Sequence, residues 1–386
     1  MSYKKVLAVL LMVGMVGVIF IGEAISQGKN QVKIGVIEPL TGPCSLEGGL
    51  TVSGIKMATE EINAKGGPLG IPIHLYIEDG KAIPGESVSA VEKLIVHNKV
   101  SVVIGAWASS ATLAIIPICE KYKVPLVVET SAHPGITMPR KDWVFRTKAT
   151  AQIDAKALEE HLIGLGFSKP VFLSVNNDWG RSVANTYAKA IERQGGTIQS
   201  HEYYSAGETN FYSILTKVKN SGANSLIITA DVNAVSIICR QSLELGMKVK
   251  KMVTSGFSAA LILKLAGADA SEGLYVVDCF PYYSPPPELA EEMRSFVERY
   301  QKRFPGKVLQ SNVIFGYIPV YMIVDAVKKA GSADRAKIRD ALEEVTYDGV
   351  TGHLEFDENH QVYPYIFVVH IENGKPVILI TVAGKP

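Results

Sequence analysis

Residues 100–128 read VSVVIGAWASSATLAIIPICEKYKVPLVV, and their pattern is the most informative one for the fold class. A short β-branched run, Val100–Ile104, precedes a helical pattern at Thr112–Tyr122, and a second short run, Pro125–Val128, follows it. Parallel strands need a crossover of about a dozen residues, which is usually a helix. The stretch therefore predicts one β-α-β unit of a parallel sheet.

The same rhythm extends in both directions along the chain. Before this unit, strands are expected at 32–37 and 71–77, with helices at 53–63 and 87–97. A second series begins after Thr147, with helices at 151–165, 181–194, 210–220 and 232–245 and strands at 171–175, 197–204, 225–229 and 252–254. Two successive series of similar length predict an α/β protein with two doubly wound parallel-sheet lobes.

The rest of the chain is too short in strands to make a third lobe. Helical patterns occur at 287–303, 312–330 and 334–344, and strand-like pieces at 351–356, 364–370 and 376–381. This tail is expected to return and complete the first two lobes. Lobe 1 would then comprise residues 31–150 and 279–345, and lobe 2 residues 151–278 and 346–386, joined by a hinge of three crossovers.

The N-terminus has the composition of an export signal. Lys4 and Lys5 precede an apolar run at 6–21, and Ala24-x-Ser26 follows with the small residues of a cleavage site. Residues 1–26 therefore predict a secretory signal and a periplasmic or otherwise extracytoplasmic protein. The alternative is an uncleaved anchor, because the run approaches the roughly 17 residues that can span a bilayer.

Charge and motif content exclude several classes of function. Lys and Arg (39) nearly balance Asp and Glu (38), so nothing indicates binding to nucleic acid or directly to a membrane surface. The sequence has no Gly-x-Ser-x-Gly elbow, Walker loop, His-Glu-x-x-His or Gly-x-Gly-x-x-Gly after a strand, and its eight His residues are scattered. We therefore expect a non-catalytic protein with no cofactor and no metal site.

Candidate ligand-binding residues follow the strands of the first series. In open α/β sheets, ligands bind beyond the carboxyl ends of the strands, where helix N-termini point. Ser109 and Ser110 open the helix after Val100–Ile104, so a hydroxyl beside unpaired N–H groups could receive a carboxylate, or could simply cap the helix. The next strand ends at a polar turn that includes Thr130, Ser131 and Ala132.

Two candidates follow strands of the second series. Trp179 lies where a strand becomes a helix, as expected either for an apolar lid or for simple packing. Asp231 follows strand 225–229, where its carboxylate could accept an ammonium or cap the next helix.

Seven stretches in order resemble the periplasmic leucine/isoleucine/valine-binding proteins. They are KIGVIEPLTGP (33–43), INAKGGPLGIPI (62–73), VIGAWASSAT (103–112), VPLVVETSA (124–132), VFRT (144–147), NNDWG (176–180) and DASEGLYVV (269–277). The resemblance implies the type I solute-binding fold, with two lobes, three crossovers and a ligand between the lobes. It also implies delivery of a branched-chain amino acid or related small molecule to the permease subunits of an ABC transporter, which would be the only link to a membrane.

The resemblance also assigns roles to residues. Ser109 matches the family's carboxylate-binding serine, the family's threonine falls on Ala132 beside Ser131, and Trp179 matches an aromatic residue that is often tyrosine. Three positions depart from the pattern. The family's ammonium-binding glutamate falls on Gly256, an aromatic residue falls on Asp231, and Glu47 occupies a place near the mouth where relatives can carry tryptophan.

These departures leave two interpretations of the ligand. In the first, Asp231 binds the ammonium of a small amino acid or amino-acid-like molecule. In the second, the ligand has no ammonium, as with amides or carboxylic acids. A ligand sensor built on the same fold is the alternative to a transport protein.

Overall fold

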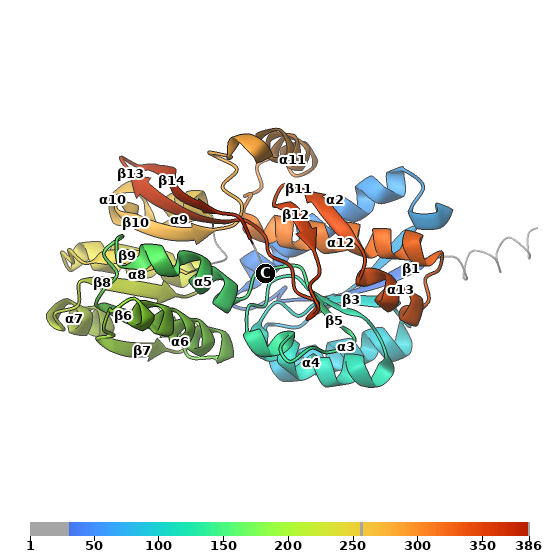
Figure 1. Ribbon diagram of the computed structural model, residues 1–386, viewed down its shortest axis with the longest axis horizontal. Helices are drawn as coiled ribbons and strands as arrows, with labels where there is room; N and C mark the ends of the chain where they lie inside the picture. Colours follow the sequence, from blue (N-terminus) through green and yellow to red (C-terminus); the bar gives the residue numbers. More distant parts are fainter. Residues whose placement is uncertain (1–30, 255–257, 385–386) are drawn as a thin grey trace, which may run out of the picture.

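The computed structural model describes residues 31–254 and 258–384. In this part of the chain, the helices and strands form two α/β lobes that lie side by side along the long axis of the molecule (Figure 1). The predicted signal, residues 1–26, lies outside the described residues. Among the helices that are described, none is long and apolar enough to cross a membrane.

Lobe 1 is built on a five-stranded sheet whose neighbouring strands are all parallel. Its order is β2 (Ile73–Asp79), β1 (Val32–Glu38), β3 (Val102–Gly105), β4 (Leu126–Val128), β5 (Val144–Arg146). Figure 1 shows helices on both faces: α3 (Pro84–Glu92) and α4 (Ser109–Tyr122) on one, α2 (Ser45–Ala64) and α12 (Ser311–Ala330) on the other. The β-α-β unit predicted within residues 100–128 is confirmed as β3, α4 and β4.

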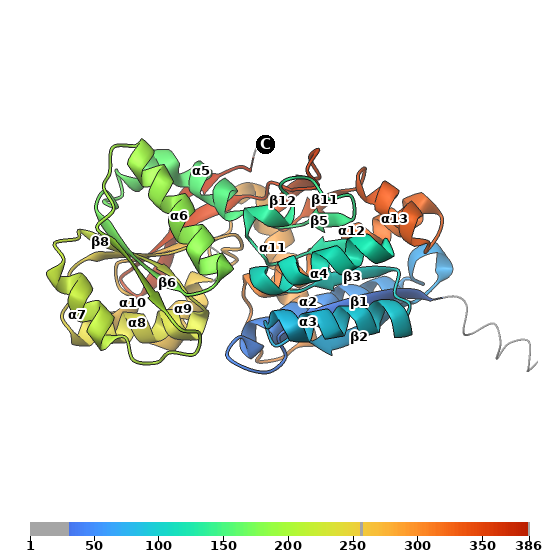
Figure 2. The ribbon, with the colours of Figure 1, turned by 90° about the horizontal axis from the view of Figure 1, so that it is seen from below.

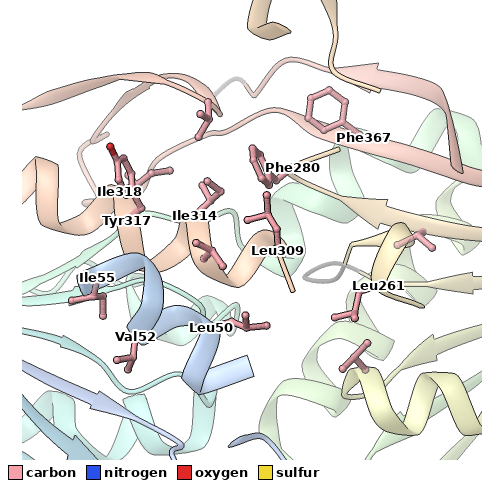
Figure 3. Packing of buried hydrophobic residues seen from close by; sticks show 14 of the residues in the cluster. Leu50, Val52, Ile55, Leu261, Phe280, Leu309, Ile314, Tyr317, Ile318 and Phe367 are labelled. Atoms are coloured by element: carbon pink, nitrogen blue, oxygen red, sulfur yellow. The ribbon is translucent and has the colours of Figure 1, made fainter. Parts of the chain in front are cut away.

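Helices α2 and α12 pack backbone against backbone, although they are far apart in the sequence. A Cβ atom added at Gly54 of α2 would lie 1.8 Å from the carbonyl oxygen of Val313, and one added at Gly316 of α12 would lie 2.0 Å from that of Thr51. Apolar side chains from both helices, including Ile55 of α2, continue this contact into the core (Figure 3). The close approach fixes α12 to lobe 1.

Lobe 2 is built on a seven-stranded sheet. Its order is β14 (Lys375–Val382), β13 (Ile366–Glu372), β10 (Leu274–Asp278), β9 (Lys250–Val253), β8 (Ser225–Thr229), β6 (Pro170–Val175), β7 (Ser200–Tyr204). Strands β10, β9, β8, β6 and β7 are parallel, whereas β13 and β14 are antiparallel to their neighbours. The helices of this lobe are α5 (Ala151–Leu162), α6 (Asp178–Arg193), α7 (Tyr212–Asn220), α8 (Val232–Glu244), α9 (Ala259–Ala266), α10 (Ala268–Ser271).

The two faces of this sheet are covered by different helices. Phe172, Ile227 and Met252 belong to the cluster under α5 and α6, whereas the alternate strand residues Leu226 and Ile228 belong to the cluster that includes α7 and α8. The alternation is that of strands buried on both faces. Two doubly wound lobes were predicted, and the structure confirms them.

The C-terminal part returns to both lobes. Helix α11 (Ala290–Arg303) follows β10 and leads to α12 and then to α13 (Arg335–Leu342). Helix α13 packs against α12. The predicted division assigned residues 346–386 to lobe 2. The structure pairs β13 and β14 with the lobe 2 sheet, whereas β11 (Thr346–Gly349) and β12 (Gly352–Glu355) form a separate hairpin against α12.

A buried arginine ties two of the crossovers together. Arg146, at the end of β5, is fully buried, and its Nε donates a 2.7 Å hydrogen bond to Oε1 of Gln361 on the crossover between β12 and β13. Its other nitrogens donate to the carbonyl oxygen of His133 and to the hydroxyl of Thr137. Gln361 in turn donates to the carbonyl oxygen of Lys148 at 2.6 Å. The hinge is therefore a hydrogen-bonded unit.

Candidate ligand-binding site

The first wall of the site is the loop between β3 and α4. Helix α4 begins at Ser109, and its N-cap is Ala108, which cannot supply a side-chain cap. The Ser109 hydroxyl therefore does not cap its own helix. It accepts a 3.3 Å hydrogen bond from the backbone N–H of His133, and the residue is 2% exposed. N–H groups of the first turn of α4 remain available to an anion.

Side chains beyond β4 hold this loop from behind. Ser131 donates a 2.8 Å hydrogen bond to the carbonyl oxygen of Trp107, and its oxygen lies 2.7 Å from the hydroxyl oxygen of Thr112. Glu129 accepts a hydrogen bond from the N–H of Trp107 at 3.1 Å. Trp107 needs this support because its φ of 56° is left-handed, which costs energy for a bulky residue. The Ser131 hydroxyl is thus engaged in shaping the loop.

Glu129 has a second buried carboxyl group beside it. Glu38, at the end of β1, is fully buried and interacts with Glu129. Burial raises the pKa of Glu129 to about 7. The pKa of Glu38 is raised by burial and also by the charge of Glu129. Two carboxyl groups so close share a proton more readily than they both ionise.

The second wall is the start of α6 in lobe 2. Asn177 is the N-cap of this helix, and its side-chain oxygen accepts a 2.9 Å hydrogen bond from the N–H of Gly180. Trp179 follows in the first turn and is half-buried. Figure 2 shows α4 and α6 approaching each other across the boundary between the lobes.

A pocket lies between these walls. With its mouth, it encloses about 500 Å³. Its lining consists of residues from both lobes and the hinge: Trp107, Ala108, Ser109, Thr130, Ser131, Ala132, Lys148, Asn177, Trp179, Asn312. Five predicted residues are therefore brought together here, namely Ser109, Thr130, Ser131, Ala132 and Trp179.

Sequence reasoning did not assign the remaining lining residues to the site. Trp107 and Asn177 lie in the stretches 103–112 and 176–180, close to the predicted residues Ser109 and Trp179. This closeness in sequence could have indicated that they line the site. Lys148 lies on the first crossover and Asn312 in the first turn of α12. Their approach to the pocket depends on how the crossovers pack, and no local pattern encodes that packing.

Asp231 is not among the lining residues of this pocket. It is the N-cap of α8, and its Oδ1 accepts hydrogen bonds of 3.0 Å from the N–H groups of Asn233 and Ala234. The capping interpretation of this residue therefore has a structural basis. Ser110 also lies outside the lining, and Gly256 lies outside the described residues.

Glu47 lies outside the pocket lining and joins the two lobes instead. Its Oε1, on α2 of lobe 1, accepts a 3.2 Å hydrogen bond from the N–H of Val232, the first residue of α8 in lobe 2. The side chain is fully buried, and burial raises its pKa to about 7, with the charge of Asp231 adding to the rise. The charge of the Glu47 carboxyl group at this contact therefore depends on pH near neutrality.

The lining of the pocket is suited to binding a small solute. It offers hydroxyl groups, backbone N–H groups and indole rings, which can hold an anion and an apolar body. In the described part of the chain, no group of three or more His, Cys, Asp or Glu residues could hold a metal ion.

Comparison with known proteins places these features in a family. The periplasmic binding protein family model matches residues 31–376. A leucine-, isoleucine-, valine-, threonine- and alanine-binding protein of Pseudomonas aeruginosa is 26% identical over 354 residues, which cover 89% of this chain and 91% of the relative.

Solved structures agree with the fold. A leucine-binding protein from Thermotoga maritima is 27% identical, covers 91% of this chain and 99% of its own, and gives a TM-score of 0.82. A solute-binding protein of an ABC transporter from Rhodopseudomonas palustris, solved with 4-hydroxybenzoate, is 20% identical with a TM-score of 0.82, over 92% of this chain and 98% of its own.

These matches confirm the predicted resemblance, the type I two-lobed fold and a role without catalysis. The family model spans most of the described chain, and the relatives match over nearly their full lengths. The chain belongs to the periplasmic binding protein family.

Proposed function

We propose that this protein captures a small solute bearing a carboxylate group between its two lobes, outside the cytoplasmic membrane, and delivers it to the permease subunits of an ABC transporter. The observation that carries the proposal is the position of Ser109. Its hydroxyl lies in the first turn of α4, where Ala108 supplies no side-chain cap, and it lines a pocket that Trp179 closes from the other lobe.

The physical basis is the chemistry of a helix N-terminus. The first N–H groups of α4 have no partners within the helix, and the helix dipole places partial positive charge beside them. A carboxylate there would accept hydrogen bonds from these groups and from the Ser109 hydroxyl. Trp107 and Trp179, one from each lobe, would cover the rest of the solute.

The ligands named for relatives share this group. The Pseudomonas aeruginosa protein is named for five amino acids, and the Rhodopseudomonas palustris structure holds 4-hydroxybenzoate. Amino acids and benzoates differ in size, charge and body, but all of them carry a carboxylate. A carboxylate is therefore the part of the ligand on which the proposal depends.

Calorimetric titration with leucine, isoleucine, benzoate and 4-hydroxybenzoate tests the proposal. Ser109→Ala should weaken binding of the best ligand by about ten- to a hundredfold, because a charge-assisted hydrogen bond contributes about 1.5–3 kcal/mol. Ser110→Ala is the matched control, since Ser110 is on the same helix but outside the pocket lining, and it should leave the dissociation constant unchanged.

Two outcomes would contradict the proposal. An unchanged dissociation constant in Ser109→Ala would remove this hydroxyl from the site. Failure of every carboxylate tested to bind would exclude the ligand class. Delivery to a permease is tested separately: deleting the gene should abolish uptake of the ligand, and wild-type protein, but not Ser109→Ala, should restore it at low ligand concentration.

A further inference from the structure

The pocket contains one charged side chain among its described lining residues, and it is a cation. Lys148 lies two residues after Arg146 on the first crossover, and it is 5% exposed. Its ammonium lies 5.5 Å from the ring centre of Phe315 on α12, at a distance suited to a cation–π contact. Its backbone is held by Gln361, which donates to the Lys148 carbonyl oxygen. The hinge thus fixes this lysine in place.

No carboxylate of the described residues forms an ion pair with Lys148 within 4.0 Å, and its ammonium donates no hydrogen bond within the described chain. Asp154 and Asp278 line an adjoining cavity on the hinge side of the lysine. Both carboxylate oxygens of Asp278 already accept hydrogen bonds. Oδ1 accepts from the N–H of Phe280 and from the hydroxyl of Ser311. Oδ2 accepts from the hydroxyl of Tyr283. A buried charge is costly unless it is paired. Among the described residues, no carboxylate is placed in contact with the lysine ammonium, so its charge leaves room for a partner in the pocket.

The described lining of the pocket offers no matching site for a cation. None of its described lining residues is an aspartate or a glutamate. The two acidic residues among the predicted candidates are engaged elsewhere: Asp231 caps α8, and Glu47 binds the N–H of Val232. An ammonium in this pocket would be buried beside Lys148 without a counter-charge.

We propose that the ligand is a carboxylate with an apolar or aromatic body and no ammonium group, and that Lys148 is its counter-ion. This inference rests on the proposed function and narrows the ligand class. The carboxylate would take the charge of the lysine and the hydrogen bonds of the first wall, formed by Ser109 and the N-terminus of α4. The rings of Trp107 and Trp179 would contact the body of the ligand, where π faces favour an aromatic or branched apolar group.

Matched pairs of ligands test the charge and the ammonium separately in the wild-type protein. Benzoate and benzamide differ in the charge of one group, and benzoate should bind at least a hundredfold more tightly. Leucine and 4-methylpentanoate differ only by the ammonium, and the carboxylate without it should bind more tightly. Tighter binding of leucine than of 4-methylpentanoate would overturn the inference, because it would require an acidic partner for the ammonium.

Substitution of the lysine provides the second test. Lys148→Met should weaken benzoate binding by about a hundredfold and leave benzamide binding within a few-fold, so that the preference for the charged ligand collapses. Lys148→Arg should retain most of that preference. Lys189→Met is the matched control, because Lys189 is an exposed residue of α6 outside the pocket. Equal losses for benzoate and benzamide in Lys148→Met would show a role in the hinge alone and overturn the inference.

The outcomes separate this inference from the function on which it rests. If leucine binds tightly and Lys148→Met leaves that affinity unchanged, the protein still binds a carboxylate solute but the inference is wrong. If neither benzoate, 4-methylpentanoate nor leucine binds, the proposed function itself fails. If Lys148→Met does not fold, the two ligand pairs in the wild-type protein still decide.

Discussion

The carboxylate of Glu47 in lobe 1 accepts a hydrogen bond from the backbone N–H of Val232 in lobe 2, at 3.2 Å. The carboxylate belongs to α2 and the N–H to α8, so this bond joins the two lobes directly. Burial in the contact raises the pKa of Glu47 to about 7. Asp231 faces the same carboxylate from the start of α8, and Cys44 faces it from the turn before α2.

We predict that ligand affinity falls as the pH rises towards neutrality. Entry of a solute requires the lobes to separate, which exposes Glu47 and returns its pKa towards the ordinary value. The closed form thus binds the proton more tightly than the open form. Closure is most favourable at pH values below the ordinary pKa and becomes weaker as the pH rises through about 7. Calorimetry between pH 5.5 and 8 should show at least about a tenfold loss of affinity.

The control for this prediction is Glu47→Gln, which has no titratable group at the contact. Its pH profile should be nearly flat. Persistence of the wild-type slope in this variant would assign the pH dependence to another group.

Asp231 provides a test of helix capping against ligand binding. Asn is as good an N-cap as Asp but carries no charge, whereas Ala removes the cap. Asp231→Ala should therefore lower the free energy of unfolding by about 1 kcal/mol, and Asp231→Asn should change it little. Neither variant should change ligand affinity by more than about twofold, because the residue lies outside the pocket lining. A large loss of leucine affinity in Asp231→Asn would instead support an ammonium site.

The Glu38–Glu129 pair should make the protein less stable as the pH rises. Both pKa values are raised in the folded protein, that of Glu129 to about 7, so the stabilisation is present at low pH and is lost as the pH rises through that value. Glu38→Gln removes one of the two charges. The fall in Tm between pH 6 and pH 8 should therefore be smaller in this variant than in wild type.

Glu160→Gln is the control for that measurement, because Glu160 is exposed on α5. It should leave the pH profile of Tm unchanged. A Glu38→Gln profile that matches wild type would show that the pair does not determine this slope.

Two glycines of α2 should respond to alanine in opposite directions. A Cβ at Gly54 would lie 1.8 Å from the Val313 carbonyl oxygen, so Gly54→Ala should separate α2 from α12 and destabilise the protein by about 3 kcal/mol. A Cβ at Gly49 meets nothing within 4 Å, so Gly49→Ala should stabilise the helix by about 0.5–1 kcal/mol. Urea unfolding of both variants measures the contrast, and equal effects would contradict the backbone contact.

Sequence patterns predicted the repeated elements well because each depends on local periodicity. The strand predicted at 225–229 is β8 with the same bounds, and the helix predicted at 232–245 is α8. The hairpin of β11 and β12 was harder, because its place beside α12 depends on packing between segments distant in sequence. The strand pattern alone does not say which lobe a returning segment joins.

The candidate site was predictable in part for the same reason. Ser109 and Thr130 follow strands, and the carboxyl ends of parallel strands meet at one edge of a sheet. Lys148 could not be recognised, because a lysine on a crossover has no periodic signal and its burial is decided by Phe315 and the hinge. The sequence also left open whether Ser109 caps α4, and the structure places Ala108 at the N-cap instead.

The return of the tail to both lobes has a consequence for biosynthesis. Lobe 1 lacks α12, which packs against α2, until residue 330 has been made, and the lobe 2 sheet lacks β13 and β14 until residue 382 has been made. A nascent chain can therefore complete neither hydrophobic core while most of it is still emerging from the ribosome. Completion of both cores therefore has to wait for the last segments of the chain.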